Sequence, residues 1–118
     1  MNQLNSLIIE GNVVNDKVEV IESTAGFQVA EFSVGVNRYY KNANNENVNE
    51  VSFFDIKCYG VLAKYAADKC VKGRTIRVVG RLKQERWVND DNVNCSKIYV
   101  VAEHLEFMPI KKTVEVKE

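Results

Sequence analysis

The chain has 118 residues and a formal net charge of zero, with 46% hydrophobic and 27% charged residues. This length and composition fit one globular domain with a single modest core. The balanced charge excludes a uniformly basic nucleic-acid binder but leaves room for a local basic face.

The sequence lacks the marks of membrane insertion, secretion and metal binding. No apolar run approaches the roughly 20 residues of a membrane span, and the first residues do not form a signal peptide. The three cysteines, Cys58, Cys70 and Cys95, are odd in number and contain no C-x-x-C pair. This argues against a disulfide framework and a zinc site. We therefore expect a reducing, cytoplasmic location and neither a metal nor another cofactor.

Alternating apolar residues predict two strands in the first part of the chain. The first covers 7–13 and resumes over 18–21, and Gly11 within it suggests a bulge or a sharp bend. The second covers 27–37 and runs on into the polar stretch 42–50, which predicts the tip of a long mobile hairpin. The inward residues of the second strand are Ala30, Phe32, Val34 and Val36.

The third strand, residues 51–60, has two different faces. The two-residue period places Phe54, Ile56 and Cys58 toward the core. The opposite face carries two large aromatic residues with a lysine between them. It consists of Phe53, Asp55, Lys57 and Tyr59. Exposed aromatic rings beside a cation suit a surface that stacks bases and holds phosphates. The alternative is that a neighbouring element covers both rings.

After Gly60 the apolar period becomes that of a helix over 61–71, with Gly73 as its stop. The inward face of this helix carries Leu62, Tyr65, Ala66 and Cys70. Two further strands are predicted at 74–87 and 97–108, joined by a polar tip at 88–96. The inward residues of the fourth strand are Ile76, Val78 and Leu82.

Three strands, one helix and two strands in this order predict an all-β fold. The best match is a five-stranded OB-fold, a Greek-key barrel with one helix between strands 3 and 4. A sandwich would show more strands and no helix. The predicted domain spans residues 1–108, and residues 109–118 form a short charged C-terminal extension.

No catalytic site is apparent in the sequence. His104 is the only histidine, and no serine or cysteine can be assigned a base from its spacing. There is no phosphate-binding loop motif and no paired metal motif. We expect His104 to have a structural or surface role, and we predict that the protein is not an enzyme.

The outward faces of three strands combine cations with aromatic rings, including the only tryptophan, Trp87. Cations can hold the phosphate chain while aromatic rings stack exposed bases. Duplex binding needs no such stacking platform, so the pattern predicts sequence-independent binding of single-stranded DNA. The alternative for Trp87 is a place in the core. The candidate DNA-binding cations are Arg38, Lys41, Lys57, Arg77, Arg81, Lys83 and Arg86.

The chain resembles the bacterial single-stranded DNA-binding proteins (SSB) over residues 4–108. The resemblance rests on I-I-E-G-N-V at 8–13, V-A-E-F-S-V-G-V-N-R at 29–38, F-F-D-I-K-C-Y-G-V-L-A at 53–63, G-R-T-I-R-V-V-G-R-L at 73–82 and R-W at 86–87. It implies that Tyr40, Phe53, Tyr59 and Trp87 stack bases. It also implies roles in DNA replication, recombination and repair, and a homotetramer built partly by pairing first strands across a dimer.

The chain departs from the family pattern in three ways. Glu10 stands where the family usually has an apolar residue, which bears on how the first strand packs. Tyr40 and Phe53 stand where tryptophan is frequent, so we expect weaker stacking per base. The family's Gly/Pro/Gln-rich linker and acidic tip, which recruits replication and repair proteins, are absent from the end K-K-T-V-E-V-K-E. Either the chain is a core fragment or it recruits partners differently.

Two other functions remain open. One is a tail-less replication accessory of the same fold, such as the primosomal replication protein N group, a dimer that helps to load a helicase. The other is an OB-fold protein-interaction module whose aromatic face is covered by a partner. A tetramer would argue against the first, and a response of Trp87 fluorescence to oligonucleotide would argue against the second.

Overall fold

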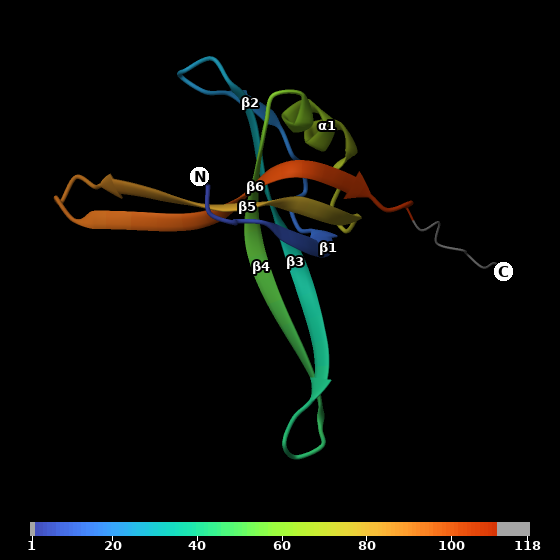
Figure 1. The fold of residues 1–118 in the computed structure, drawn as a ribbon. Helices are drawn as coiled ribbons and strands as arrows, with labels where there is room; N and C mark the ends of the chain where they lie inside the picture. The colour runs from blue at the N-terminus through green and yellow to red at the C-terminus, as the bar shows by residue number, and fades with distance from the viewer. Residues whose placement is uncertain (1, 111–118) are drawn as a thin grey trace.

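The computed structural model describes residues 2–110, which form a small barrel with two long hairpins extending from it (Figure 1). The strands lie in the order β1-β5-β6-β4-β3-β2, and a further pairing of β1 with β3 closes the barrel. All paired strands are antiparallel except β4 and β6. The predicted five-stranded barrel with a single helix is confirmed. The elements are β1 (Leu7–Val13), β2 (Val20–Glu22), β3 (Gln28–Lys41), β4 (Asn47–Tyr59), α1 (Val61–Lys69), β5 (Thr75–Val88) and β6 (Asn94–Phe107).

The first predicted strand is divided in the structure. β1 pairs with β5 along most of its length, whereas the short β2 pairs only with β3. Gly11 serves the close approach of two strands, because a Cβ atom there would lie 2.6 Å from the carbonyl oxygen of Gly35 on β3. At this crossing β1 leaves β5 and reaches β3, which closes the barrel.

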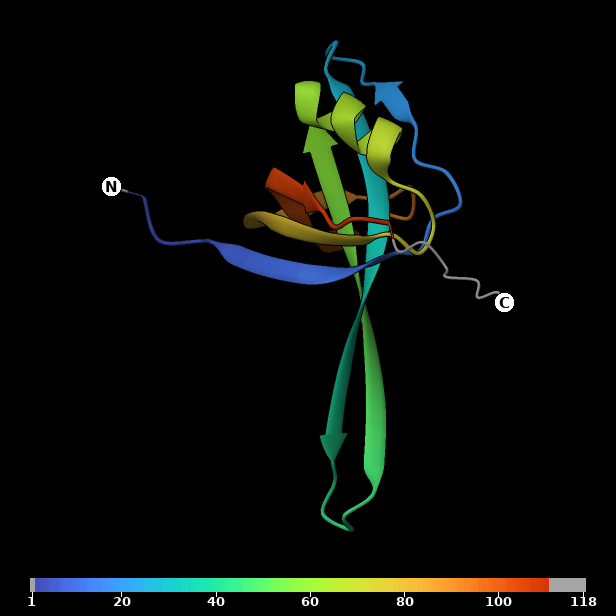
Figure 2. The same ribbon diagram turned by 90° about the vertical axis from the view of Figure 1, so that its right-hand side faces the viewer.

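The core lies inside the barrel, and α1 covers one end of it (Figure 2). Ala63 and Ala66 are fully buried, because small side chains let the helix approach the barrel closely. Tyr65 lies at the rim, where it packs edge to face against Phe107 with ring centroids 5.1 Å apart. The inward predictions are confirmed for the buried residues Ala30, Phe32, Val34, Ile56, Cys58, Ile76 and Val78.

Three residues predicted to face the core are exposed instead. Phe54 is 39% exposed, Tyr65 is 44% exposed and Leu82 is 48% exposed. Phe54 lies opposite the buried Val34 and Leu82 opposite the buried Val100, so both lie at the edge of the core. From this edge the paired strands β3–β4 and β5–β6 continue beyond the barrel as two-stranded ribbons (Figures 1 and 2). We call these ribbons the first arm and the second arm.

Three predicted boundaries also change. The helix ends at Lys69 rather than at residue 71, and Gly73 has its positive φ of 87° in a separate turn. The polar tips are shorter than 42–50 and 88–96, because the strands of each arm pair as far as Lys41 with Asn47 and Val88 with Asn94. Of the predicted extension 109–118, residues 111–118 lie outside the described part of the chain. Within residues 2–110, the structure contains no helix with the length and apolar character needed to cross a membrane.

Candidate nucleic-acid interface

The outward face of β4 carries two accessible aromatic rings. Phe53 is 65% exposed and Tyr59 is 37% exposed, so neither belongs to the core. Asp55 and Lys57 lie between them at the same strand parity. The alternative in which a neighbouring element covers both rings is therefore wrong for Phe53. This face can offer flat apolar surfaces to bases.

Lys57 ties this face to the second arm. Its Nζ lies 3.1 Å from Glu31 Oε2 and 3.7 Å from Glu85 Oε2, and it sits 4.3 Å from the centre of the Tyr99 ring. Burial favours the neutral amine, but the carboxylates of Glu31 and Glu85 outweigh it and raise the pKa of Lys57. Lys57 thus stays protonated, and its charge is already balanced within the protein.

A second ion pair joins β4 to the second arm. Lys97 Nζ lies 3.5 Å from Asp55 Oδ2. Ser33 Oγ donates a hydrogen bond of 2.7 Å to Asp55 Oδ1. These contacts fix the outward face of β4 against β3 and β6 where the two arms diverge.

Trp87 lies on the second arm and is 47% exposed, which excludes the alternative of a core position. It pairs across the ribbon with Cys95. A shallow hollow of about 500 Å³ adjoins it, and Arg86 and Ser96 are among the residues that line this hollow. Trp87 is therefore placed to receive a flat ring from solvent.

Two neighbouring tyrosines of the first arm, Tyr39 and Tyr40, lie on opposite faces of the ribbon. Register places Phe53 opposite Gly35 and Tyr39 opposite Asn49, so Phe53 and Tyr39 share one face of the ribbon. Tyr40 lies on the other face, with the Arg38 guanidinium 4.4 Å from its ring centre. Tyr39 is 74% exposed and Tyr40 only 37%. Tyr39 is not among the stacking residues predicted from the sequence, although strand parity from Gly35 places it on the same face as Phe53.

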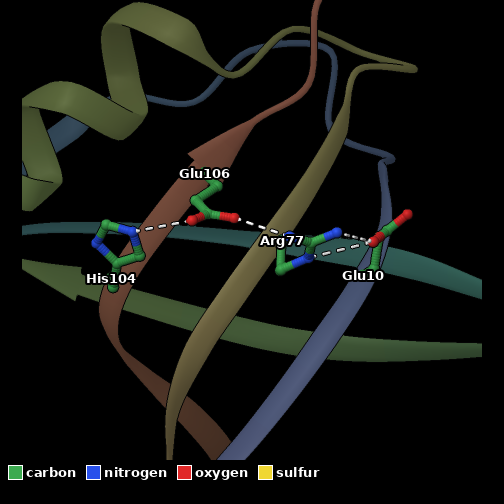
Figure 3. A network of polar contacts seen from close by, with 4 residues as sticks. All are labelled: Glu10, Arg77, His104 and Glu106. Atoms are coloured by element: carbon green, nitrogen blue, oxygen red, sulfur yellow. Dashed lines mark hydrogen bonds and ion pairs between the residues drawn. The ribbon is translucent and has the colours of Figure 1, made fainter.

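Arg77 belongs to a charged network on the outer surface of β1, β5 and β6 (Figure 3). Its guanidinium lies 2.9 Å from Glu10 Oε1 and 3.0 Å from Glu106 Oε1, and His104 Nε2 lies 3.5 Å from Glu106 Oε2. Glu10 therefore points outward, which explains how a carboxylate is accommodated at a position that is usually apolar. Two carboxylates around one guanidinium leave Arg77 little capacity for a phosphate.

The other predicted cations divide into two groups. Arg81 is paired with Glu103 at 3.2 Å and Arg38 with Glu50 at 3.6 Å. The remaining cations have no carboxylate at ion-pair distance within residues 2–110. They are Lys41, Lys83 and Arg86, and two of these three lie on the second arm beside Trp87.

Comparisons with known proteins show to which family the chain is similar. The sequence profile described as "SSB: Single-strand binding protein family" matches residues 4–108. The chain is 36% identical to a single-stranded DNA-binding protein of Aquifex aeolicus over 97% of this chain and 76% of that protein. It is 29% identical to single-stranded DNA-binding protein B of Bacillus subtilis over 91% of this chain and 92% of that protein.

Solved structures show the same fold. A Plasmodium falciparum SSB in complex with ssDNA superposes with a TM-score of 0.79 at 23% identity, covering 92% of this chain and 98% of that chain. A deletion mutant of the single-stranded DNA binding protein from Thermus aquaticus also gives a TM-score of 0.79, at 18% identity, covering 92% of this chain and 52% of that chain.

Proposed function

The chain belongs to the single-strand binding protein family, and from this premise we propose that it binds single-stranded DNA without regard to sequence. Membership of a family of non-enzymatic DNA-binding proteins also confirms the prediction that the chain is not an enzyme. The bound DNA would be protected during replication, recombination and repair. The predicted cytoplasmic location fits this role. It is also consistent with Cys58, Cys70 and Cys95, which are all free thiols.

One observation carries the proposed binding surface. Trp87 is half exposed on the same arm as Lys83 and Arg86, which have no carboxylate at ion-pair distance within the described residues. A ring that stacks bases, together with cations that hold phosphates, is what sequence-tolerant binding of a single strand requires. Phe53, Tyr59 and Tyr40 supply further rings, and Tyr39 joins them on the first arm.

We also propose a homotetramer that begins with a dimer formed through β1. β1 pairs with β5 from Leu7 to Asn12 but with β3 only at Asn12 and Val13. The other edge of residues 7–11 therefore has no strand partner within the described chain. Such an edge can pair with another copy of itself. A native mass measurement giving a dimer would instead favour the replication accessory protein.

Titration with oligo-dT, followed by Trp87 fluorescence at two salt concentrations, tests the proposed function. We expect strong quenching, because a base that stacks on the Trp87 ring changes its emission. The quenching should weaken at higher salt, because salt screens the contacts between the cations and the phosphates. A duplex of the same length should compete poorly. Equal binding of duplex and single strand would overturn the proposal. Absence of quenching at low salt would favour the protein-interaction module.

A further inference from the structure

A small polar crevice lies where the two arms diverge, beside the outward face of β4. Its volume is about 150 Å³, and it draws residues from β3, β4, β6 and the segment before β2. Both lysines in it are already neutralised, Lys57 by Glu31 and Lys97 by Asp55. The crevice is therefore poorly suited to a phosphate. Its main polar lining is Asn15, Glu31, Asp55, Lys57, Lys97 and Tyr99.

The lining nevertheless has hydrogen-bonding capacity to spare. The side chains of Glu31 and Asp55 are 55% and 51% exposed, so their carboxylate oxygens can accept further bonds. Tyr99 is 98% buried, being only 2% exposed, and its hydroxyl has no hydrogen-bond partner among the described residues. Buried polar groups are nearly always paired, and an unpaired one is costly. Carboxylates, ammonium groups and an unsatisfied hydroxyl in one crevice suit a ligand with donors and acceptors side by side.

We propose that this crevice is a base-edge subsite that prefers guanine within an otherwise sequence-independent path, an inference that rests on the proposed function. The pairing edge of guanine carries two adjacent N–H donors, at N1 and N2, next to the O6 acceptor. A carboxylate can take both donors while a lysine ammonium donates to O6. Adenine, cytosine and thymine each place a ring nitrogen acceptor or a carbonyl oxygen where guanine has one of these donors. A carboxylate repels either of these acceptors.

The position of the crevice makes this contact feasible. Phe53 and Tyr59 lie on either side of Asp55 and Lys57 on the same strand face. Six residues of extended strand separate the two rings by about 20 Å. A single strand that stacks on both rings must pass over the crevice, and its unpaired bases are free to turn their edges toward the protein.

Oligo-dT strands with one central substitution test the inference directly. We expect a strand carrying one dG to bind at least about fivefold more tightly than plain oligo-dT, as for a good bidentate base contact. Deoxyinosine lacks the N2 amino group, so it should lose most of this gain, and dA should show none. Equal affinity for dG and dT, or for dG and deoxyinosine, would overturn the inference.

Variants locate the preference in the crevice. The ratio of dG to dT affinity should fall toward one in Asp55→Asn or Glu31→Gln, because the amide replaces one acceptor oxygen of the carboxylate with an NH₂ group, which is itself a donor. Tyr99→Phe should also lower the ratio, because it removes the buried hydroxyl from the lining of the crevice. Glu19→Gln is the matched control, since Glu19 pairs with Lys17 outside the crevice. An unchanged ratio in all three crevice variants would overturn the assignment.

The same titrations separate failure of the inference from failure of the proposed function. Tight binding of plain oligo-dT with no gain for dG leaves single-strand binding intact and removes only the guanine subsite. Failure of every strand to bind would overturn the proposed function and the subsite with it.

Discussion

The two arms are alike at their tips and different along their faces. At each tip one asparagine side chain accepts hydrogen bonds from two backbone N–H groups, Asn42 in the first arm and Asn89 in the second. Three residues later another asparagine takes a positive φ, 63° at Asn45 and 61° at Asn92. Asparagine tolerates this conformation better than most residues. The same local hydrogen bonds and backbone conformation thus form the turn at the tip of each arm.

Along their faces the arms differ in how their cations are paired. In the first arm Arg38 is held by Glu50 and lies against the Tyr40 ring. In the second arm Lys83 and Arg86 have no carboxylate at ion-pair distance within residues 2–110. Among the candidate cations of the first arm, only Lys41, next to the tip, has no such carboxylate within residues 2–110, so the second arm offers more cations to phosphates. We therefore expect the second arm to contribute more to the salt-sensitive part of DNA binding.

The largest expected difference between the two arms is in the reactivity of their cysteine thiols, Cys58 at the base of the first arm and Cys95 on the second. Cys58 is buried in β4, and burial raises its pKa to about 12 from an ordinary value near 9. Its thiolate population is therefore lowered by about a thousandfold. A maleimide should label native Cys95 alone, and oligo-dT should slow that labelling because Cys95 lies opposite Trp87. Labelling that persists in Cys95→Ser would contradict this contrast.

The same raised pKa values predict a loss of stability in alkali. Burial also raises the pKa of Cys70, to about 11. The unfolded thiols lose their protons near pH 9, before the folded ones do, so the unfolded state is favoured as pH rises. The contribution of these thiols to the free energy of unfolding should be complete below pH 9 and decline as pH rises toward 11 and 12, the pKa values of folded Cys70 and Cys58. Denaturant titrations of the wild type and Cys58→Ala would test this, and an equally steep fall in both would argue against Cys58 as the cause.

Removing the Trp87 ring is expected to cause the largest loss of DNA affinity. Trp87→Ala should weaken binding of oligo-dT by about 1–3 kcal/mol and leave the salt dependence nearly unchanged, because a stacking contact releases no counterions. Tyr40→Ala in the first arm is the comparison. Its smaller ring is already covered by Arg38 on one side, so it should cost less. A larger loss from Tyr40→Ala would reverse the ranking of the arms.

The contrast between the arms was only partly predictable from the sequence. Apolar periods identified the strands, the helix and both polar tips, because these signals are local. They placed Phe54 and Leu82 in the core, because parity does not tell where a strand leaves its barrel. The pairing of Lys57 with Glu31 and Glu85 joins residues 26 and 28 positions apart along the chain. Only the assembled strands bring those carboxylates to the lysine, so the sequence showed a cation but not its partners.

Salt dependence measures the difference in charge pairing directly. Lys83→Ala should lower the slope of log affinity against log salt by about 0.7, the value for one phosphate contact on a single strand. Arg81→Ala should lower it by less, because Glu103 already neutralises Arg81 at 3.2 Å. Binding isotherms at four or more salt concentrations would determine both slopes. An equal reduction in the two variants would mean that DNA displaces Glu103.

The smallest expected effect lies at the tips, where the arms are most alike. Asn42→Ala and Asn89→Ala each remove a side chain that accepts two backbone N–H groups, so each should lower the local opening free energy of its turn by about 1 kcal/mol. Asn42→Ala should cost slightly more, because Asn42 Nδ2 also donates a bond of 3.0 Å to Glu46. Amide hydrogen exchange at Glu46 and Val93 would measure each turn separately. Since neither asparagine is among the candidate DNA-binding residues, oligo-dT affinity should stay within about twofold, and a larger change would mean that tip geometry orients the faces of the arms.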